Sequence, residues 1–275
     1  MNRNIKQSLR ILIQEWQIRH LPVIKPREIQ LGDWFTDEAV NKTVSVVGFR
    51  RTGKTFLLLD FAKKQGQGNC LYINLEDERL PRDTAVLTQL VDVIKEFYGT
   101  KKLFLLLDEI QEIPDWSRWV RRVNETGLYN LIISGSSSKL SLAEIPTELR
   151  GRTITKTVFP LSFSEFKKWK DSTNDLLLLR EYLFFGGLPE IVLADEGKKS
   201  ILLDEYFQTF LLRDVFERFH LRQEQAMRDL IRLVLSSTYY TFGKLTQSLK
   251  IAGYAIGKGT VAKYLSLLSS SYFLN

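Results

Sequence analysis

The sequence contains little of what disulfide-bonded, zinc-binding or membrane-spanning proteins need. It has one cysteine, Cys70, so no disulfide can form within the chain, and the apolar stretch around it predicts a buried structural thiol. The two histidines, His20 and His220, lie far apart, and no cysteine–histidine cluster has the spacing of zinc ligands. No apolar run reaches the roughly 20 residues that a membrane-spanning helix needs.

The N-terminus also lacks the apolar core of a secretion signal. Gln14, Glu15 and Arg19 interrupt the apolar positions of the first helical stretch. We therefore predict a cytoplasmic protein with no membrane partner. With 44% hydrophobic and 26% charged residues the composition is typical of a globular protein, and the net charge of +7 permits a polyanionic partner without requiring one.

What the sequence does contain is a glycine-rich motif, GFRRTGKT, at residues 48–55. It matches the P-loop pattern GxxxxGK[ST], between a β-branched apolar stretch at 43–47 and a helical pattern at 56–64. In such a loop, backbone amides surround phosphate oxygens at a helix N-terminus, and glycines permit the close approach. The residues predicted to bind the nucleotide here are Gly48, Arg50, Arg51, Thr52, Gly53, Lys54, Thr55 and Phe56.

Four side chains are candidates for specific roles in phosphoryl chemistry. We expect Lys54 to reach the β- and γ-phosphates and the Thr55 hydroxyl to bind Mg²⁺. A second signal lies at 102–109, where the apolar run of a central parallel strand ends in Asp108 and Glu109. Asp108 is predicted to complete the Mg²⁺ site, and Glu109 is predicted to orient and polarise the attacking water.

Further candidates follow the later strands. A polar residue after the strand expected at 130–133 is placed to bind the γ-phosphate or the attacking water, and Ser136 is favoured over Ser134. Arg150 or Arg152 is placed to stabilise charge on the γ-phosphoryl group, within one subunit or from a neighbour. A plain serine–glycine turn and an ordinary surface arginine remain the alternatives.

The patterns predict an α/β protein in three parts. Residues 1–159 are predicted to form a P-loop core, a parallel sheet with helices on both faces, followed by a helical lid at 160–224 and a winged helix-turn-helix at 225–275. Gly187 and Pro189 interrupt the helical pattern and are candidate hinge residues near the nucleotide, or else mark a plain helix-breaking turn. Strands are expected at 43–47, 69–75, 102–108, 130–133 and 153–159, and helices at 1–20, 56–64, 84–98 and 114–126.

Two finer expectations concern helix ends and the last part of the chain. Asp115 is the N-cap candidate of the helix at 114–126. Lys258, Lys263 and Tyr264 fall on or near the expected recognition helix, and an apolar strand is expected after it. DNA binding through this part and packing against the nucleotide domain both remain open.

With these residues in place, the chain resembles a family of prokaryotic AAA-type P-loop ATPases. The segments that carry the resemblance are, in order, GFRRTGKT, LFLLLDEIQEIPDW, ISGSSSKL, LRGRTITKTVFPLSFSEF and YLFFGGLPE. The resemblance implies ATP as the nucleotide and one additional strand between the P-loop strand and the Asp108 strand. Arg152 occupies a place similar to the arginine finger of AAA-type ATPases, and Gly187 and Pro189 match a Gly-x-Pro block that contacts nucleotide in related signalling ATPases. Many family members continue into a domain that resembles a restriction-type nuclease, and no function of that domain is carried over.

The leading hypothesis is a Mg²⁺-dependent ATP hydrolase that uses nucleotide state as a conformational switch, with self-association or a protein partner. The alternative is a nucleic-acid-binding winged helix in which ATP is structural or regulatory, and the pI of about 9.3 favours it. Glu109 beside Asp108 and the long C-terminal extension argue against a small-molecule kinase. The lack of an NKxD-type guanine motif argues against a GTPase.

Overall fold

A computed structural model describes residues 2–35, 42–135, 149, 151–170, 172–221 and 223–274. The chain divides into two units, Met1–Leu193 and Ala194–Asn275. The boundary falls inside the segment predicted as a lid, and the predicted division into three domains stays a prediction. No helix in the described residues is both long and apolar enough to cross a bilayer.

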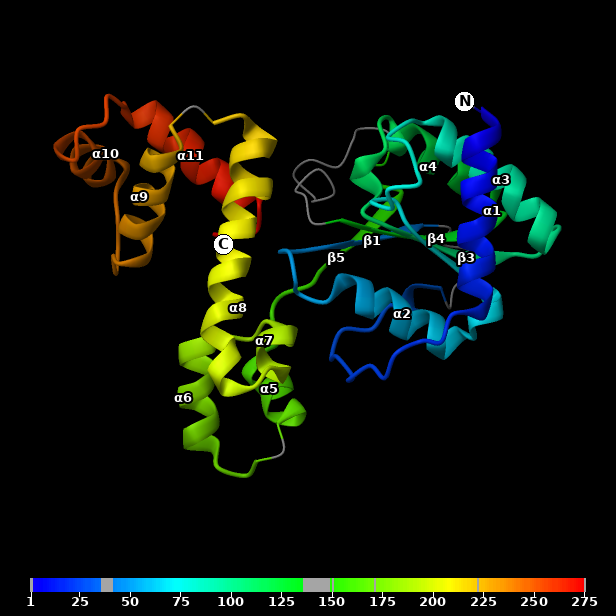
Figure 1. Cartoon of the computed structure of the whole chain (residues 1–275), viewed down its shortest axis with the longest axis horizontal. Helices are drawn as coiled ribbons and strands as arrows, with labels where there is room; N and C mark the ends of the chain where they lie inside the picture. Colours follow the sequence, from blue (N-terminus) through cyan, green and yellow to red (C-terminus); the bar gives the residue numbers. More distant parts are fainter. Residues whose placement is uncertain are drawn as a thin grey trace. The chain divides into compact units, whose positions relative to one another are not determined.

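A five-stranded parallel sheet forms the centre of the first unit (Figure 1). Its strand order is β2-β3-β4-β1-β5, so β4 lies between the strand that leads into the P-loop and the strand that ends in Asp108. The predicted α/β class and the additional strand are therefore confirmed. The strands are β1 (Thr43–Val47), β2 (Cys70–Asn74), β3 (Leu103–Asp108), β4 (Tyr129–Gly135) and β5 (Thr153–Thr157).

The burial of each strand follows from its sequence. Every residue of β1 is buried, and β3 and β4 are almost as fully buried, because helices cover both faces of a parallel sheet. The edge strand β5 alternates threonine with Ile154 and Lys156, and all its residues are only partly buried. Asn74 pairs with Asp108 across β2 and β3, and Val47 pairs with Gly135 across β1 and β4. The carboxyl ends of these strands therefore meet at one edge of the sheet.

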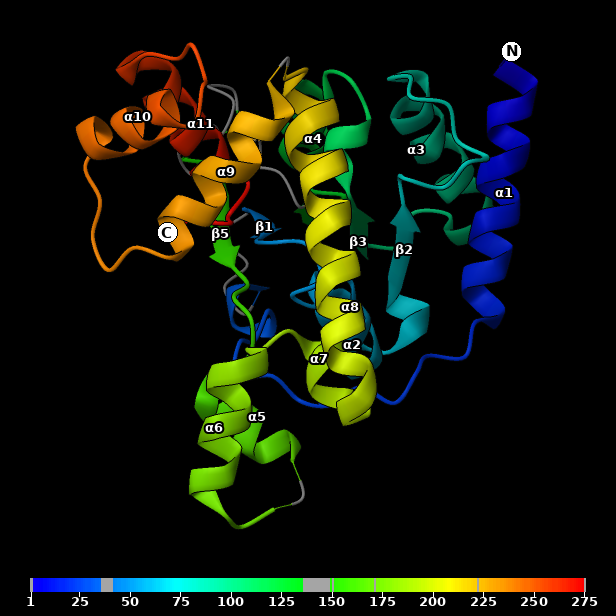
Figure 2. The ribbon, with the colours of Figure 1, turned by 60° about the vertical axis from the view of Figure 1, so that its left-hand side comes forward.

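Helices cover both faces of the sheet. In Figure 1, α2 lies on one face, and α3 and α4 lie on the other. Figure 2 shows α1 alongside the β2 edge, where the Trp16 indole donates to the carbonyl of Cys70 at 2.7 Å. The helices and short 3₁₀ turns are α1 (Asn2–Ile18), η1 (Gly32–Phe35), α2 (Lys54–Gln65), η2 (Gln67–Asn69), α3 (Ala85–Tyr98), η3 (Ile110–Glu112) and α4 (Trp116–Thr126).

Two local expectations have different outcomes. Cys70 is fully buried, as predicted, and burial raises the pKa of its thiol to about 12.

Asp115 lies at the N-cap position of α4, but its side chain does not cap the helix. A capping residue normally has an extended backbone, whereas Asp115 has a φ of 52° in the left-handed region, which is not the backbone conformation of a cap.

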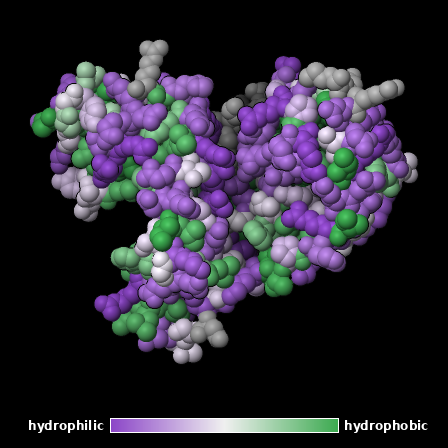
Figure 3. All heavy atoms as spheres, viewed as in Figure 1, coloured by the Kyte–Doolittle hydropathy of each residue, from purple (hydrophilic) through white to green (hydrophobic). Residues whose placement is uncertain are grey.

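Three short helices complete the first unit: α5 (Phe163–Trp169), α6 (Asp175–Phe185) and α7 (Pro189–Leu193). They enclose a small apolar core of Leu161, Phe166, Leu178 and Val192. On its outer side α6 leaves an apolar surface uncovered, and Figure 3 shows hydrophobic residues where this helix lies. Its exposed members are Leu176, Leu177, Leu179, Leu183 and Phe184.

The break before α7 is fixed by a close approach between two backbone segments. The Leu161 amide donates to the Gly187 carbonyl at 2.7 Å. A Cβ at position 187 would lie 2.3 Å from the carbonyl oxygen of Leu161, which no side chain can tolerate without a backbone shift. Gly187 is therefore required by packing, and the segment 186–188 is held in place in this structure.

The second unit is helical in its described residues. A π-helical segment, η6 (Phe210–Glu217), follows directly on α8, and Gly253 lies in the turn between α10 and α11. The predicted helix–turn–helix pattern is thus present, but the strand expected after it is not formed. The amides of Phe273 and Leu274 donate back to the Leu268 carbonyl, so residues 271–274 turn at the end of α11. The helices are α8 (Glu196–Thr209), α9 (Glu224–Leu235), α10 (Phe242–Ile251) and α11 (Lys258–Ser270).

Candidate functional site

The glycine-rich loop connects β1 to α2 at the carboxyl edge of the sheet. Both of its glycines have positive φ angles, 147° at Gly48 and 94° at Gly53. A Cβ at Gly48 would lie 2.2 Å from the Val158 carbonyl oxygen, so only glycine fits between the loop and the chain that leaves β5. The predicted strand–loop–helix context of the motif is confirmed.

Lys54, the first residue of α2, turns back into the loop. Its ammonium group donates to the carbonyl oxygens of Gly48 and Phe49, both at 3.0 Å, and its side chain is buried. Thr52 is also buried, and its hydroxyl donates to the Phe49 carbonyl at 2.9 Å. The loop is therefore closed around a positive charge at the N-terminus of a helix, where an anion is also stabilised.

Asp108 ends β3 with a buried carboxylate that accepts hydrogen bonds from three hydroxyl groups. Thr55 of α2 donates to its Oδ2 at 2.7 Å, Tyr72 of β2 donates to the same oxygen at 2.9 Å, and Ser134 of β4 donates to Oδ1. Burial and the neighbouring Glu109 raise the pKa of Asp108, although the three hydroxyl groups oppose the shift. The geometry thus joins the P-loop helix to three strands through one carboxylate.

The donor set around Asp108 fits Mg²⁺. A carboxylate and the Thr55 hydroxyl are hard oxygen ligands, which Mg²⁺ prefers when it also binds phosphate groups. Both groups lie beside the phosphate-binding end of α2, and the contact between them brings two predicted metal ligands together. Their assignment as metal ligands remains a prediction.

Glu109 follows Asp108 in a left-handed conformation with a φ of 52°. Its amide donates to the Ser134 hydroxyl at 3.3 Å, and its carboxylate accepts the side-chain amide of Gln111 at 2.5 Å. A positive φ is uncommon outside glycine, so the chain here is held by its surroundings rather than by its own preference. The turn carries the Glu109 side chain out of the strand, at the same edge of the sheet as the P-loop.

The two arginines of the P-loop interact with different segments. Arg51, with a φ of 67°, forms an ion pair at 3.2 Å with Glu190, the second residue of α7. Burial raises the pKa of the Glu76 carboxylate, just beyond β2. The positive charge of Arg50 lies close enough to oppose this rise. Phe56, the last predicted nucleotide-binding residue, is half exposed on α2.

The structure also brings Pro189 to the P-loop. A Cβ at Gly53 would lie 3.6 Å from the Pro189 ring and 3.7 Å from the Arg27 guanidinium. The Gly187–Pro189 segment is thus adjacent to the loop, as a nucleotide-contacting role requires. That role itself stays a prediction.

The remaining candidates lie elsewhere. Arg152 precedes β5, where its carbonyl accepts the amide of Thr43, the first residue of β1. The P-loop begins at the other end of β1, roughly 15 Å away at the usual rise per residue. The structure therefore does not bring Arg152 to the P-loop of its own chain. Ser136 and Arg150 lie outside the described residues.

Sequence reasoning missed two residues of this site and underrated a third. Tyr72 was not singled out, although a tyrosine in a buried strand needs a partner for its hydroxyl. Arg27, whose guanidinium lies against Gly53, was not singled out either. Ser134, the second choice after Ser136 at the strand expected at 130–133, is the serine whose hydroxyl contacts Asp108.

Comparison with known proteins agrees with this geometry. The AAA domain family matches residues 40–167, which contain the sheet, the P-loop and Asp108. This chain carries an AAA domain. Residues 176–275 match a different family model, a domain of unknown function (DUF8612).

Two relatives, one archaeal and one bacterial, match most of this chain. An uncharacterized protein of Methanocaldococcus jannaschii is 34% identical over 96% of this chain, and an uncharacterized protein of Haemophilus influenzae is 30% identical over 86% of it. The chain spans 63% and 62% of the lengths of these two relatives. Among solved structures, the Aeropyrum pernix ORC1 protein in complex with DNA aligns with 97% of this chain and 82% of its own, at 12% identity and a TM-score of 0.40. The predicted resemblance to prokaryotic AAA-type proteins is confirmed.

The buried charge of Asp108 gives a testable prediction for the AAA domain. A carboxyl group whose pKa is higher in the folded state destabilises the fold above that pKa, and the cost disappears below the unfolded value of about 3.9. Asp108→Asn should therefore raise the melting temperature at pH 8, by roughly 2–4 °C for each 1 kcal/mol gained, and the gain should shrink as the pH falls toward 4. Thermal unfolding at several pH values measures both effects.

The control for this prediction is Asp92→Asn, which removes an exposed carboxylate paired with Lys6. It should leave stability at pH 8 nearly unchanged. A melting temperature of Asp108→Asn that is below wild type at pH 8, or a gain that does not depend on pH, would contradict the expected cost of burying this charge.

Proposed function

We propose that the AAA domain binds ATP with Mg²⁺, hydrolyses it, and uses the nucleotide state as a conformational switch. One observation carries the proposal: the Thr55 hydroxyl and the Asp108 carboxylate meet at 2.7 Å beside the closed loop around Lys54. These groups come from different elements, and phosphoryl transfer needs them in one place.

The proposed roles follow from the chemistry of each group. The loop amides and the Lys54 ammonium would hold the phosphate oxygens, once Lys54 leaves the carbonyls that it now contacts. Thr55 and Asp108 would hold Mg²⁺, which neutralises phosphate charge when bound. Tyr72 and Ser134 would keep the Asp108 carboxylate oriented.

Glu109 is the proposed base for the attacking water. It follows Asp108 directly, and its left-handed backbone directs the side chain out of the strand at the edge where the phosphates would lie. In this structure its carboxylate accepts a hydrogen bond from Gln111. Gln111 would have to move, or share the carboxylate with water, during turnover.

The proposed switch links the P-loop to the helices that follow the sheet. Pro189 packs near Gly53, and Arg51 pairs with Glu190, so a change in the loop reaches the start of α7. Nucleotide state can shift this arrangement only if ATP and ADP bind its two conformations with different affinities.

The central test is ATP hydrolysis with Mg²⁺ by wild type and by Glu109→Gln. The variant should bind ATP as wild type does but lose turnover by roughly 10²–10⁴-fold, which is the usual contribution of a general base. Glu112→Gln is the matched control, because it neutralises a carboxylate three residues away that pairs with Arg82, and it should keep its activity. A Glu109→Gln protein with wild-type turnover would remove Glu109 from this role.

Arg152 is proposed to act in the site of a neighbouring subunit. Its place at the start of β5 is at the opposite end of the sheet from its own P-loop, so only a second copy could bring it to a γ-phosphate. In mixed assemblies, Arg152→Ala subunits should lower turnover by their wild-type partners. Arg121→Ala removes another arginine that pairs with Glu125 and serves as the control. If turnover by the mixed assemblies equals the average of the wild-type and Arg152→Ala proteins, action between subunits would be contradicted.

A second candidate function, nucleic-acid binding, is favoured by one surface of the second unit. Tyr239, Tyr240 and Phe242 are exposed, and the Lys244 ammonium lies 4.6 Å from the centre of the Tyr239 ring. Exposed aromatic rings beside basic groups bind single-stranded nucleic acid by stacking and by phosphate contact. Tyr264, which falls on or near the expected recognition helix, is buried on α11.

Salt dependence tests this second function. Binding of single-stranded DNA should weaken steeply as the salt concentration rises. Lys244→Ala should reduce the slope of the logarithm of the binding constant against the logarithm of the salt concentration by about one. Lys198→Ala, on α8 of the same unit, is the matched control and should leave the slope unchanged. DNA binding that is weak even at low salt would contradict the function.

A further inference from the structure

Arg27, whose guanidinium lies against Gly53, forms a nearly buried ion pair with Glu165. The Arg27 Nε lies 2.7 Å from Glu165 Oε1, and the two side chains are only 11% and 7% exposed. Nη2 of the same guanidinium contacts the second carboxylate oxygen at 3.3 Å, so the pair is bidentate. Burying two charges is costly, and the fork geometry with added hydrogen bonds is what offsets the cost.

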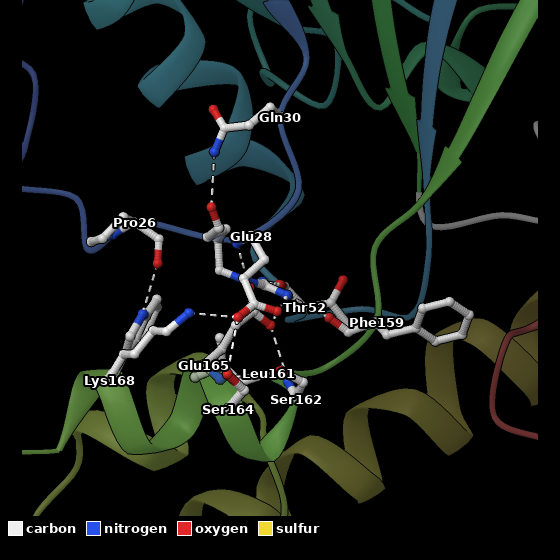
Figure 4. Close-up of polar contacts among 12 residues, drawn as sticks. Pro26, Glu28, Gln30, Thr52, Phe159, Leu161, Ser162, Ser164, Glu165 and Lys168 are labelled. Carbon is white, nitrogen blue, oxygen red and sulfur yellow. Dashed lines mark hydrogen bonds and ion pairs between the residues drawn. The ribbon is translucent and has the colours of Figure 1, made fainter. Parts of the chain in front are cut away.

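Two further hydrogen bonds from Arg27 go to backbone carbonyls of two other segments. Nη1 donates to the carbonyl of Thr52 in the P-loop at 2.9 Å, and Nη2 donates to that of Phe159, between β5 and α5, at 3.0 Å. Glu165 in turn accepts the amides of Glu28 at 2.8 Å and Ser162 at 3.0 Å. Figure 4 shows Glu165 between these groups, with Thr52 and Phe159 beside it.

The contact with Thr52 has a consequence for the next amide. The Thr52–Gly53 peptide is trans, as is every peptide in the described residues. In a trans peptide the carbonyl and the N–H point in opposite directions. Anchoring the Thr52 carbonyl on Arg27 therefore directs the Gly53 N–H away from Arg27, in a loop whose function is to present amides to phosphate oxygens.

We infer that Arg27 is a positioning residue that fixes the orientation of the Gly53 amide for phosphate binding, and that Glu165 holds Arg27 in place. The inference rests on the proposed nucleotide function of the P-loop. Because Glu165 lies on α5 and Phe159 precedes it, the same pair ties the loop to the helices after the sheet. A lysine cannot replace Arg27, since one ammonium group cannot span the carboxylate and two carbonyls in a planar fork.

The test combines hydrogen exchange with ATP binding. In nucleotide-free Arg27→Lys, amides in a peptide covering residues 48–56 should exchange about tenfold faster than in wild type, while β3 peptides stay unchanged. The dissociation constant for Mg²⁺–ATP should rise about tenfold, the effect of losing one charge-assisted hydrogen bond. Arg10→Lys is the matched control, because Arg10 forms a comparable fork with Glu96 between α1 and α3, and it should change neither quantity.

The exchange pattern separates positioning from a merely structural role. Faster exchange throughout the first unit, or unchanged exchange at 48–56, would overturn the inference. Glu165→Gln is a second variant, which keeps Arg27 but removes the charge that holds it. In this variant too, amide exchange should be faster at residues 48–56 and unchanged in β3, with a smaller increase than in Arg27→Lys. Wild-type protein that binds no Mg²⁺–ATP would refute the proposed function instead, because the exchange experiment needs no nucleotide.

Discussion

The buried carboxylate of Asp108 is the interaction on which the arrangement of the site depends. A single charge in the interior must be matched by donors, and here the hydroxyl groups of Thr55, Tyr72 and Ser134 supply them. Each comes from a different element, so the carboxylate is satisfied only when α2, β2 and β4 are in register around β3. The requirement for paired donors thus helps to align the P-loop helix with the sheet.

Two further constraints act on the loop itself. Backbone close to Gly48 leaves no room for a side chain, and Gly53 lies between Arg27 and Pro189. The loop is therefore held from the sheet side by the chain that leaves β5, and from outside by Arg27, which precedes β1, and Pro189, which follows β5. These contacts restrain a loop of about six residues in which Gly48, Arg51 and Gly53 all have positive φ angles.

Local patterns predicted the strands, the P-loop and the Asp108–Glu109 pair because each is decided by a few neighbouring residues. Long apolar runs mark central parallel strands, and the glycine spacing marks the loop. The Arg27–Glu165 and Tyr72–Asp108 pairs join residues 138 and 36 positions apart, and no local pattern indicates which distant group a buried polar side chain will meet. The two errors have another cause. At Asp115 a left-handed backbone overrides the local preference, and at residues 272–274 hydrogen bonds back to Leu268 do so.

The position of Lys54 has a thermodynamic consequence. Its ammonium group has two carbonyl partners inside the loop, so this buried charge is hydrogen-bonded within the chain itself. An incoming phosphate must therefore compete with the loop's own oxygens for this cation. The loop oxygens are thus internal partners of the lysine, and they lower the net affinity for a phosphate by the free energy of the two contacts that are exchanged.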